Sequence, residues 1–463
     1  MFWLNFMEGV IVIQVTMYAA TGILGYGFPE ESLIRALESR PAFLGCDGGS
    51  CDPGPNYLGM GKAICSRGAT KRDARLLIKA ALGRGIPLII GSCGGSGSDQ
   101  GLAWTSDIVE EILAEEGLHA KIARIHSEQA PAYILKKLEE GKISPLDTMP
   151  ELSADTVKRS AHISAAMGPE PIQAALREGA QIVLAGRATD TSIYAAVPLL
   201  MGCPPGPVWH AAKIIECGAA CSFPKSHDSM LAHIREDSFI LEPPNPEKRV
   251  RKINAAAHTM YENVNPYEIT EPDGIIDTRE CVYEQIDEHR VQVYGSRFRK
   301  KPYSVKLEAV ESVGFRSICI GGTRDPGLIA ILDAFLEKVR SAVEKRVEDV
   351  CGLTREAYAL TFFRYGRDGV MGAMEPLASS AHEIGILMDV VAPDQELADT
   401  IIGIARSLLL HTDFEGRKCN AGNIAFPFSP TDIQVGEVFR FTMSHALWLD
   451  DPMEPFRTEW AEV

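Results

Sequence analysis

The fold class can be inferred from one stretch, PLIIGSCGGSGSDQGLAWTSDIVEEILAEEGLHAKIARI, residues 87–125. An apolar run at 87–91 is followed by a turn rich in glycine and serine. A helical segment then ends at Gly117, and a second apolar run covers 121–125. Glycine just past a helix is typical of a left-handed C-cap. The order strand, turn, helix, strand predicts two parallel strands joined by a right-handed crossover.

The same alternation continues through the first half of the chain. Helical segments at 71–85 and 169–179 close on Gly83 and Gly179. The pattern predicts an α/β domain at residues 1–238 with a doubly wound, mostly parallel sheet. Smaller domains are expected to follow, an α+β domain at 239–351 and an α/β domain at 352–463. The further strand-like runs are at residues 10–18, 42–45, 162–166 and 181–186.

Composition limits the classes of function. Hydrophobic residues make up 46% of the 463 residues and charged residues 23%, as in soluble globular proteins. The net charge of −16 opposes binding to nucleic acid or to an anionic membrane, because phosphates are repelled. Eleven scattered cysteines are typical of a reducing cytoplasm. We therefore expect a cytoplasmic protein with a small-molecule partner, and a homo-oligomer for an enzyme of this size.

Polar loops follow the predicted strands, at the edge where parallel sheets bind ligands. The loop CDGGSCDPGP (46–55) carries Asp47, Ser50 and Asp52. Two converging carboxylates could bind a divalent cation, or one could act as a general base. Alternatively, each aspartate caps its own turn. We take Asp47 and Asp52 as candidate catalytic residues and candidate metal ligands.

The loop GSCGGSGSDQG (91–101) is the candidate anion site. Glycine lets backbone amides approach an anion, and the helix that follows adds partial positive charge. The loop has neither the lysine of a phosphate-binding P-loop nor the G-x-G-x-x-G spacing. The alternative is a tight turn that simply requires glycine. The candidate binding residues are Ser92, Gly94, Gly95 and Ser96.

The loop GRATDTS (186–192) places Arg187 and Asp190 after another strand. An arginine binds a carboxylate with two parallel hydrogen bonds, and Asp190 could act on the same substrate. Alternatively, Arg187 and Asp190 pair with each other. The loop HSEQ (126–129) adds Glu128 to this edge, whereas His126 and His162 are typical of packed histidines.

Other chemistries have weaker signals. No C-x-x-C pair is present, which opposes a zinc or iron–sulfur site. A nucleophilic Cys46 or Cys93 has no histidine adjacent to it in the sequence. No NAD, FAD or PLP signature is visible. A polar loop at 411–430 contains Asn423 and could cover the ligand edge or form a subunit contact.

Several motifs together resemble the acyclic terpene utilisation protein A (AtuA-like) family over nearly the full length. They include TGILGYGFPEES, DGGSCDPGPNYLG, LAGRATDTSIYAAVPL, IIECGAACS and AGNIAFPFSP. The resemblance places the family's D-x-G-S-x-D-x-G-P loop on Asp47, Ser50 and Asp52. Its G-R-x-x-D turn falls on Arg187 and Asp190, and its E-C-G run begins at Glu216. A family N-A-G-G loop is replaced here by residues 92–95, SCGG.

The resemblance implies a role in breaking down branched acids through CoA thioesters, in some members with a small partner polypeptide. The residues themselves favour proton transfer next to a carboxylate, because the loops combine carboxylates with an arginine and free amides. We expect a lyase (hydro-lyase, that is, a hydratase) or an isomerase. The alternatives are a non-catalytic subunit that binds an acid or acyl-CoA, and a hydrolase using Ser50 or Cys46.

Overall fold

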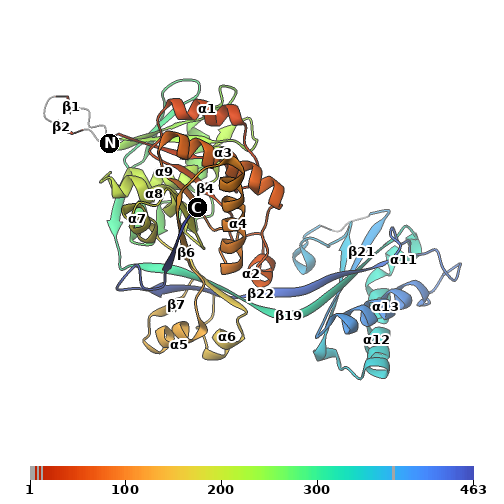
Figure 1. Cartoon of the computed structure of the whole chain (residues 1–463). Coiled ribbons are helices and arrows are strands. Elements are labelled where there is room, and N and C mark those ends of the chain that lie inside the picture. The colour runs from red at the N-terminus through yellow and green to blue at the C-terminus, as the bar shows by residue number, and fades with distance from the viewer. Residues whose placement is uncertain (1–5, 8–9, 12–13, 378–380) are drawn as a thin grey trace. The chain divides into compact units, whose positions relative to one another are not determined.

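The computed structural model describes residues 6–7, 10–11, 14–377 and 381–463 (Figure 1). The chain forms two compact units. The large unit comprises Met1–Glu311 and Phe441–Val463, and the small unit comprises Ser312–Arg440. The chain passes between them within two long strands, β19 (Ser304–Thr323) and β22 (Asp432–Trp448).

These bounds differ from the three expected ranges. The expected boundary at residue 238 falls at the start of β12 (Ser238–Glu242), which pairs with β11 (Met230–Ile234) in the main sheet of the large unit. Backbone hydrogen bonds between these two strands hold both sides of that boundary in one sheet. The chain returns to the large unit after residue 440.

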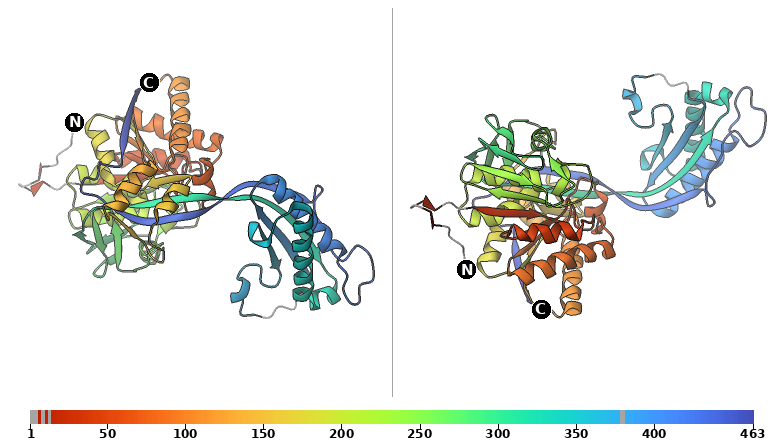
Figure 2. Two further views of the ribbon diagram at one scale, coloured as in Figure 1. Left: turned by 90° about the horizontal axis from the view of Figure 1, so that it is seen from below. Right: turned by 90° about the horizontal axis from the view of Figure 1, so that it is seen from above.

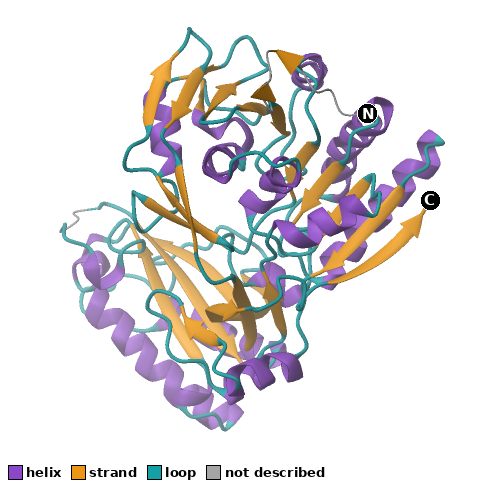
Figure 3. Ribbon diagram, turned by 90° about the vertical axis from the view of Figure 1, so that its left-hand side faces the viewer, coloured by secondary structure: helices purple, strands orange, loops and turns teal. Residues whose placement is uncertain are grey.

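The main sheet of the large unit has five parallel strands at its centre. Antiparallel strands extend it at both ends. β11 pairs with β3, and the C-terminal strand β23, which leads to the end marked C in Figure 3, pairs with β6. The predicted α/β class and parallel sheet are confirmed. The parallel strands, in spatial order, are β3 (Val15–Ala19), β4 (Leu44–Asp47), β5 (Leu88–Gly91), β9 (Ile182–Ala185) and β6 (Lys121–His126). The antiparallel ones are β16 (Val282–Gln285), β17 (Val291–Tyr294), β12, β11 and β23 (Arg457–Glu462).

Helices cover both faces of this sheet, so it is doubly wound (Figure 1). The parallel strands are buried on both sides, because Leu88 and Ile90 face one helical layer and Ile89 the other. One layer contains α1 (Glu30–Glu38), α3 (Arg67–Arg84) and α4 (Asp99–Glu116). The other contains α7 (Pro169–Arg177), α8 (Asp190–Leu200) and α9 (Pro205–Ile215).

The run at 162–166 forms a strand, β8 (His162–Ala165), but this strand does not join the main sheet. It pairs antiparallel with β19, with Ser164 opposite Glu308. This pairing has a consequence for the site, because it places Glu308 beside the loop that follows β9.

Two local expectations need correction, and a third is confirmed. Gly83 lies inside α3, which continues to Arg84, and Gly85 provides the left-handed cap instead. Gly117 caps α4 as expected. The first strand of the parallel sheet begins at Val15 rather than at residue 10, and residues 12–13 of the expected run lie outside the described residues.

The small unit has a sheet covered on one face by two helices (Figure 2). Its edge strand β20 (Ala359–Tyr365) pairs with β21 (Ile384–Ala392), which pairs with β19. Apolar residues alternate along β21 and face α12 (Leu332–Cys351) and α13 (Gln395–His411).

None of the helices in the described part has the length and apolar content needed to cross a membrane.

The remaining helices and strands are short. The short helices are α2 (Asn56–Met60), α5 (Pro131–Glu139), α6 (Ala154–Arg159), α10 (Lys252–Thr259), α11 (Pro326–Ala330) and the 3₁₀ turns Gly218–Cys221, Arg355–Ala357 and Gly372–Met374. The short strands are β1 (Phe6–Met7), β2 (Val10–Ile11), β7 (Ile143–Pro145), β10 (Ser222–Phe223), β13 (Arg249–Val250), β14 (Glu268–Glu271), β15 (Gly274–Asp277) and β18 (Arg297–Lys300).

Candidate functional site

Arg187 is the centre of a buried charged cluster at the carboxyl edge of the parallel strands. It follows β9 and is 6% exposed. Its Nε donates to Glu308 Oε2 at 2.8 Å, and its Nη1 donates to Ser92 Oγ at 3.1 Å and to Asp190 Oδ1 at 3.1 Å. We call Arg187, Asp190, Glu308, Ser92 and Asp47 the Arg187 cluster. Four of its five members were predicted from the sequence.

Asp47 is one of two buried carboxyls in this cluster, the other being Glu308. It ends β4, and its Oδ1 accepts a hydrogen bond from the Gly48 amide at 2.9 Å. Burial raises the pKa of Asp47 well above its ordinary value, and the nearby Asp190 raises it further. Arg187 and the Ser92 hydroxyl only partly offset this. The Asp47 carboxyl therefore favours its protonated form.

Glu308 is the member that sequence reasoning missed. Burial alone raises its pKa, but Arg187 and Lys306 outweigh burial and lower the pKa to about 2. Lys306 Nζ lies 2.9 Å from Glu308 Oε1. The only signal in the sequence is that two charged residues, Lys306 and Glu308, alternate with apolar residues in 305–310, and nothing there identifies Arg187 as the partner of Glu308.

A second group of buried charges lies next to Asp190. Lys213 Nζ is 2.5 Å from Glu216 Oε1, and Thr191 Oγ1 donates to Glu271 Oε2 at 2.7 Å. Burial raises the pKa of both Glu216 and Glu271 to about 8, and the charge of Asp190 contributes to each rise. Glu216 was predicted, whereas Lys213 and Glu271 were not.

Asp52 and Ser50 form a local turn. Ser50 Oγ donates to Asp52 Oδ2 at 2.7 Å, and the Asp52 amide donates back to Ser50 Oγ at 3.2 Å. Asp52 is exposed whereas Asp47 is buried, and their side-chain hydrogen bonds in the described part of the chain go to different partners, Ser50 and the Gly48 amide. The alternative in which this aspartate stabilises its own turn therefore fits Asp52.

A metal at Asp47 and Asp52 stays a prediction. Among the described residues, no group of three or more His, Cys, Asp and Glu side chains is arranged to hold a metal ion. A single buried carboxyl with a raised pKa is a poor ligand for a hard cation, which binds the ionised form.

The glycine loop after β5 is closely packed. The Gly95 amide donates to Ser92 O at 2.7 Å, so this amide already has a partner. A Cβ on Gly94 would lie 2.6 Å from Gly101 Cα, and one on Gly97 would lie 2.0 Å from the Arg187 nitrogen. The tight-turn alternative thus accounts for these glycines. Ser96 is buried in the same loop.

Glu128 lies at the amino end of α4. Its Oε2 accepts the Asp99 amide at 3.0 Å, and its Oε1 is 2.5 Å from His162 Nδ1. Burial raises its pKa, but His162 and the Asp99 amide outweigh this and lower the pKa below its ordinary value. Glu128 thus has internal partners. Asn423 belongs to the small unit, where its Oδ1 accepts a hydrogen bond from Cys419 Sγ at 3.2 Å.

The candidate nucleophiles lack activation. Burial raises the pKa of both the Cys46 and the Cys93 thiol well above the ordinary value, which disfavours a thiolate. Among the described residues, Ser50 Oγ donates to the Asp52 carboxylate and hydrogen-bonds to no histidine. The hydrolase alternative therefore gains no support from these groups.

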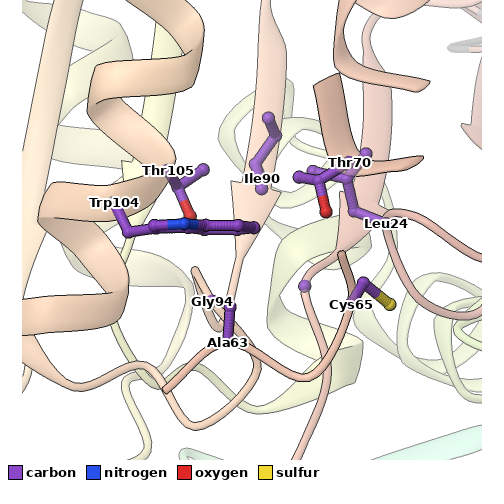
Figure 4. Close-up of a pocket in the computed structure, with 9 residues that line it drawn as sticks. Leu24, Ala63, Cys65, Thr70, Ile90, Gly94, Trp104 and Thr105 are labelled. Carbon is purple, nitrogen blue, oxygen red and sulfur yellow. The ribbon is translucent and has the colours of Figure 1, made fainter. Parts of the chain in front are cut away.

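A small cavity lies on the α3–α4 side of the same edge (Figure 4). Its volume is about 10 Å³, close to the space one water molecule occupies. Loops after β3, β4 and β5 contribute Leu24, Gly48 and Gly94, and α4 contributes Trp104 and Thr105.

The fold is that of a doubly wound α/β protein. Its buried ion pair, Arg187 with Glu308, lies at the carboxyl ends of the parallel strands, which is where sheets of this kind bind ligands. More particularly, the chain belongs to the acyclic terpene utilisation family. The family described as "Acyclic terpene utilisation family protein AtuA" matches residues 77–201 and 209–418. Neither the curated proteins nor the solved structures gave a significant match.

Proposed function

We propose that the protein is an enzyme of carboxylic-acid catabolism that moves a proton next to the carboxylate or CoA thioester of its substrate. The reaction class is a hydro-lyase or an isomerase. The observation that carries this is the pair Asp47 and Asp190, two carboxyls in different environments around one arginine. A buried carboxyl whose pKa is raised can donate a proton, and an accessible carboxylate beside it can take one.

The two aspartates take complementary roles in this proposal. The side chain of Asp190 is 28% exposed, so a substrate can reach it, and its carboxylate takes the proton from the carbon next to the carbonyl. The electron pair of that C–H bond forms the new C=C bond. The bond to the β-hydroxyl breaks, and Asp47 donates its proton to the departing oxygen, which leaves as water.

Arg187 stabilises charge in the same step. Its hydrogen bonds within the described residues use the backbone nitrogen, Nε and Nη1, and Nη2 takes part in none of them. We assign Nη2 to the carbonyl or carboxylate oxygen on which negative charge develops. The family description supports an acid derived from acyclic terpenes as the substrate class.

Exchange of hydrogen with solvent tests the proposal. The purified protein is incubated in D₂O with 3-methylbut-2-enoyl-CoA, 3-hydroxy-3-methylbutyryl-CoA and their free acids. Deuterium at the α-carbon and interconversion of the two compounds are followed by NMR and mass spectrometry. We expect Asp190→Asn and Asp47→Asn each to lower the rate by about 10²–10⁴-fold.

Asp107→Asn, at an exposed position on α4, is the matched control and should keep the wild-type rate. Circular dichroism shows whether each variant is folded. A folded wild-type protein that exchanges and interconverts none of the four compounds contradicts the proposal.

One observation favours the non-catalytic alternative. Arg187 is already paired with Glu308 and Asp190, as a structural ion pair would be. A subunit that only binds an acid or acyl-CoA would give a calorimetric binding signal but no exchange, either alone or with a small partner polypeptide. That partner, a homo-oligomer, a cytoplasmic location and a bound divalent cation all stay predictions.

A further inference from the structure

Ser296 and His210 form a hydrogen-bonded pair in the large unit. His210 lies in α9 and is fully buried, and its Nδ1 is 2.7 Å from Ser296 Oγ. Ser296 is half-buried in the turn between β17 and β18. A serine hydroxyl within hydrogen-bond reach of a histidine is the arrangement that activates serine as a nucleophile. This pair is outside the Arg187 cluster and takes no part in the proton transfer proposed above.

The hydrogen-bond network assigns the tautomer of His210. Its Nε2 is 2.8 Å from Thr259 Oγ1, and that hydroxyl donates to the carbonyl oxygen of Ala255 at 3.1 Å. Because a hydroxyl has one hydrogen, the Thr259 oxygen accepts from Nε2–H, and Nδ1 carries the lone pair that accepts from Ser296. Burial lowers the pKa of His210 to about 3, so the imidazole is neutral at pH 7 and keeps this lone pair.

Ser296 lines a cavity of about 510 Å³, which is within the size range of small-molecule sites. Tyr294, Phe298 and the prolines at the start of α9 contribute apolar residues to its lining. Glu236 and Asp237, both exposed, also belong to the lining. The cavity therefore combines apolar walls with negative charge.

The amino end of α9 brings an amide hydrogen to the same cavity. The helix begins with Pro205, Gly206 and Pro207, and because proline has no N–H, Gly206 carries the only amide hydrogen of the three. The first amides of a helix have no partner within it. A Cβ on Gly206 would lie 2.4 Å from Ser296 O, so the two backbones approach closely. The Gly206 amide is thus available to an oxyanion that forms at Ser296.

Cys281 is the other nucleophile near this histidine. Its Sγ lies 3.7 Å from His210 Nδ1 and 3.6 Å from Ser296 Oγ, farther than the serine is from the histidine. Burial raises the pKa of the Cys281 thiol, which disfavours the reactive thiolate. The geometry thus favours Ser296, which lines the cavity, over Cys281.

We propose that Ser296 and His210 form a second site of the protein, in which Ser296 accepts the acyl group of a carboxylic ester. Ser296 Oγ bonds to the acyl carbon while its proton passes to His210 Nδ1. The bond from that carbon to the alcohol oxygen breaks, and this oxygen takes the proton from Nδ1. Water then attacks the acyl-serine with His210 again as the base, and the acid is released. The carboxylates of the cavity repel anions, so the ester is neutral or cationic.

Labelling of Ser296 tests the site. The full chain is incubated with p-nitrophenyl acetate, a neutral ester, and separately with a fluorophosphonate. Trypsin releases residues 291–297, VQVYGSR, in which Ser296 is the only serine. Mass spectrometry should find an acetyl or phosphonyl group on this peptide. Ser296→Ala should remove the label and lower the rate of ester cleavage by about 10²-fold or more.

Ser407→Ala, at an exposed serine of α13, is the matched control and should react like the wild type. Cys281→Ala should also keep the label on residues 291–297. Thr259 is a positioning residue, because it acts through His210. Thr259→Val removes the acceptor of Nε2–H and should slow ester cleavage at least about 10-fold, since the tautomer is no longer fixed. Thr259→Ser keeps the hydroxyl and should restore the rate.

The charge of the cavity is tested with the p-nitrophenyl monoester of succinic acid, which carries a carboxylate. It should react at least about 10-fold more slowly than the acetate, and Glu236→Gln combined with Asp237→Asn should narrow the difference. Equal rates for the two esters would reject a neutral or cationic substrate.

The site itself is wrong if the wild-type protein gains no label on residues 291–297, or if Ser296→Ala or Thr259→Val cleaves the ester as the wild type does. Neither ester is a substrate of the exchange assay, so each proposal can fail without the other.

Discussion

The guanidinium of Arg187 donates through Nε to the carboxylate of Glu308 at 2.8 Å, and 121 residues separate them in the sequence. Both side chains are buried, with 8% and 5% of their surfaces exposed. Burying a single charge is strongly unfavourable, so the charge of each residue offsets the desolvation cost of the other. The pair holds the loop after β9 against β19.

Removing Glu308 should strongly destabilise the large unit. Glu308→Gln leaves the Arg187 charge partly uncompensated, and breaking a buried pair costs about 3–5 kcal/mol. Urea unfolding measures the change. Glu111→Gln, which breaks the exposed pair with Arg67, should leave the unfolding midpoint nearly unchanged. An equal loss in both variants would contradict the burial argument.

Glu271 should make the protein less stable as the pH rises. Burial raises its pKa from 4.5 to about 8, so the folded state binds more protons than the unfolded state between these values. The free energy of unfolding therefore falls as pH rises from about 5 to 8. Glu271→Gln, which is neutral throughout, should show a shallower fall. Denaturant unfolding at a series of pH values measures both slopes, and parallel slopes would refute the assignment.

His162 should likewise contribute stability that is lost as the pH rises. Its hydrogen bond to Glu128 raises its pKa above the ordinary 6.5. A folded-state pKa above the unfolded value gives stability that is complete below pH 6.5 and is lost as pH rises through the folded pKa. His162→Gln should therefore destabilise the protein most below pH 6.5 and least at a pH above the folded-state pKa of His162. His119→Gln, at an exposed position, is the matched control and should leave the free energy of unfolding nearly unchanged.

Alanine substitutions at Gly97 and Gly85 should distinguish the cost of backbone strain from the cost of a steric clash. Both have positive φ, +67° and +64°, but only Gly97 has an atom in the way of a Cβ. Gly85→Ala should cost about 1 kcal/mol for the left-handed conformation. Gly97→Ala should cost about 1–3 kcal/mol more, because Arg187 backbone atoms cannot move aside. Thermal unfolding of the two variants measures the difference, and similar losses would show that Gly97 packs more loosely.

The parallel sheet was predictable because its signals are local. The run at 87–91 and the helix that ends at Gly117 each carry their own apolar pattern and cap, and β5 and α4 form there. The run at 162–166 has an equally good local pattern. Its partner, β19, is more than 100 residues away, so the sequence could not show that β8 leaves the main sheet.

The position of the candidate site in the fold was predictable from the sequence, but the orientation of its side chains was not. The loops with Asp47, Ser92 and Arg187 follow parallel strands, and such loops meet at one edge of the sheet. Asp52 comes from one of these loops but turns back on Ser50. Which side chain of a loop points inward depends on packing, and no periodicity reports it.

Composition and periodicity alone predicted the α/β class, the parallel strands and the edge of the sheet at which the polar loops lie. These features follow from local backbone preference and from the pattern of buried residues along each element. The raised pKa of Asp47 and the pairing of Arg187 with Glu308 came only with the fold. Each depends on contacts between segments far apart in the chain and on the loss of water around them, and no short stretch of sequence encodes either.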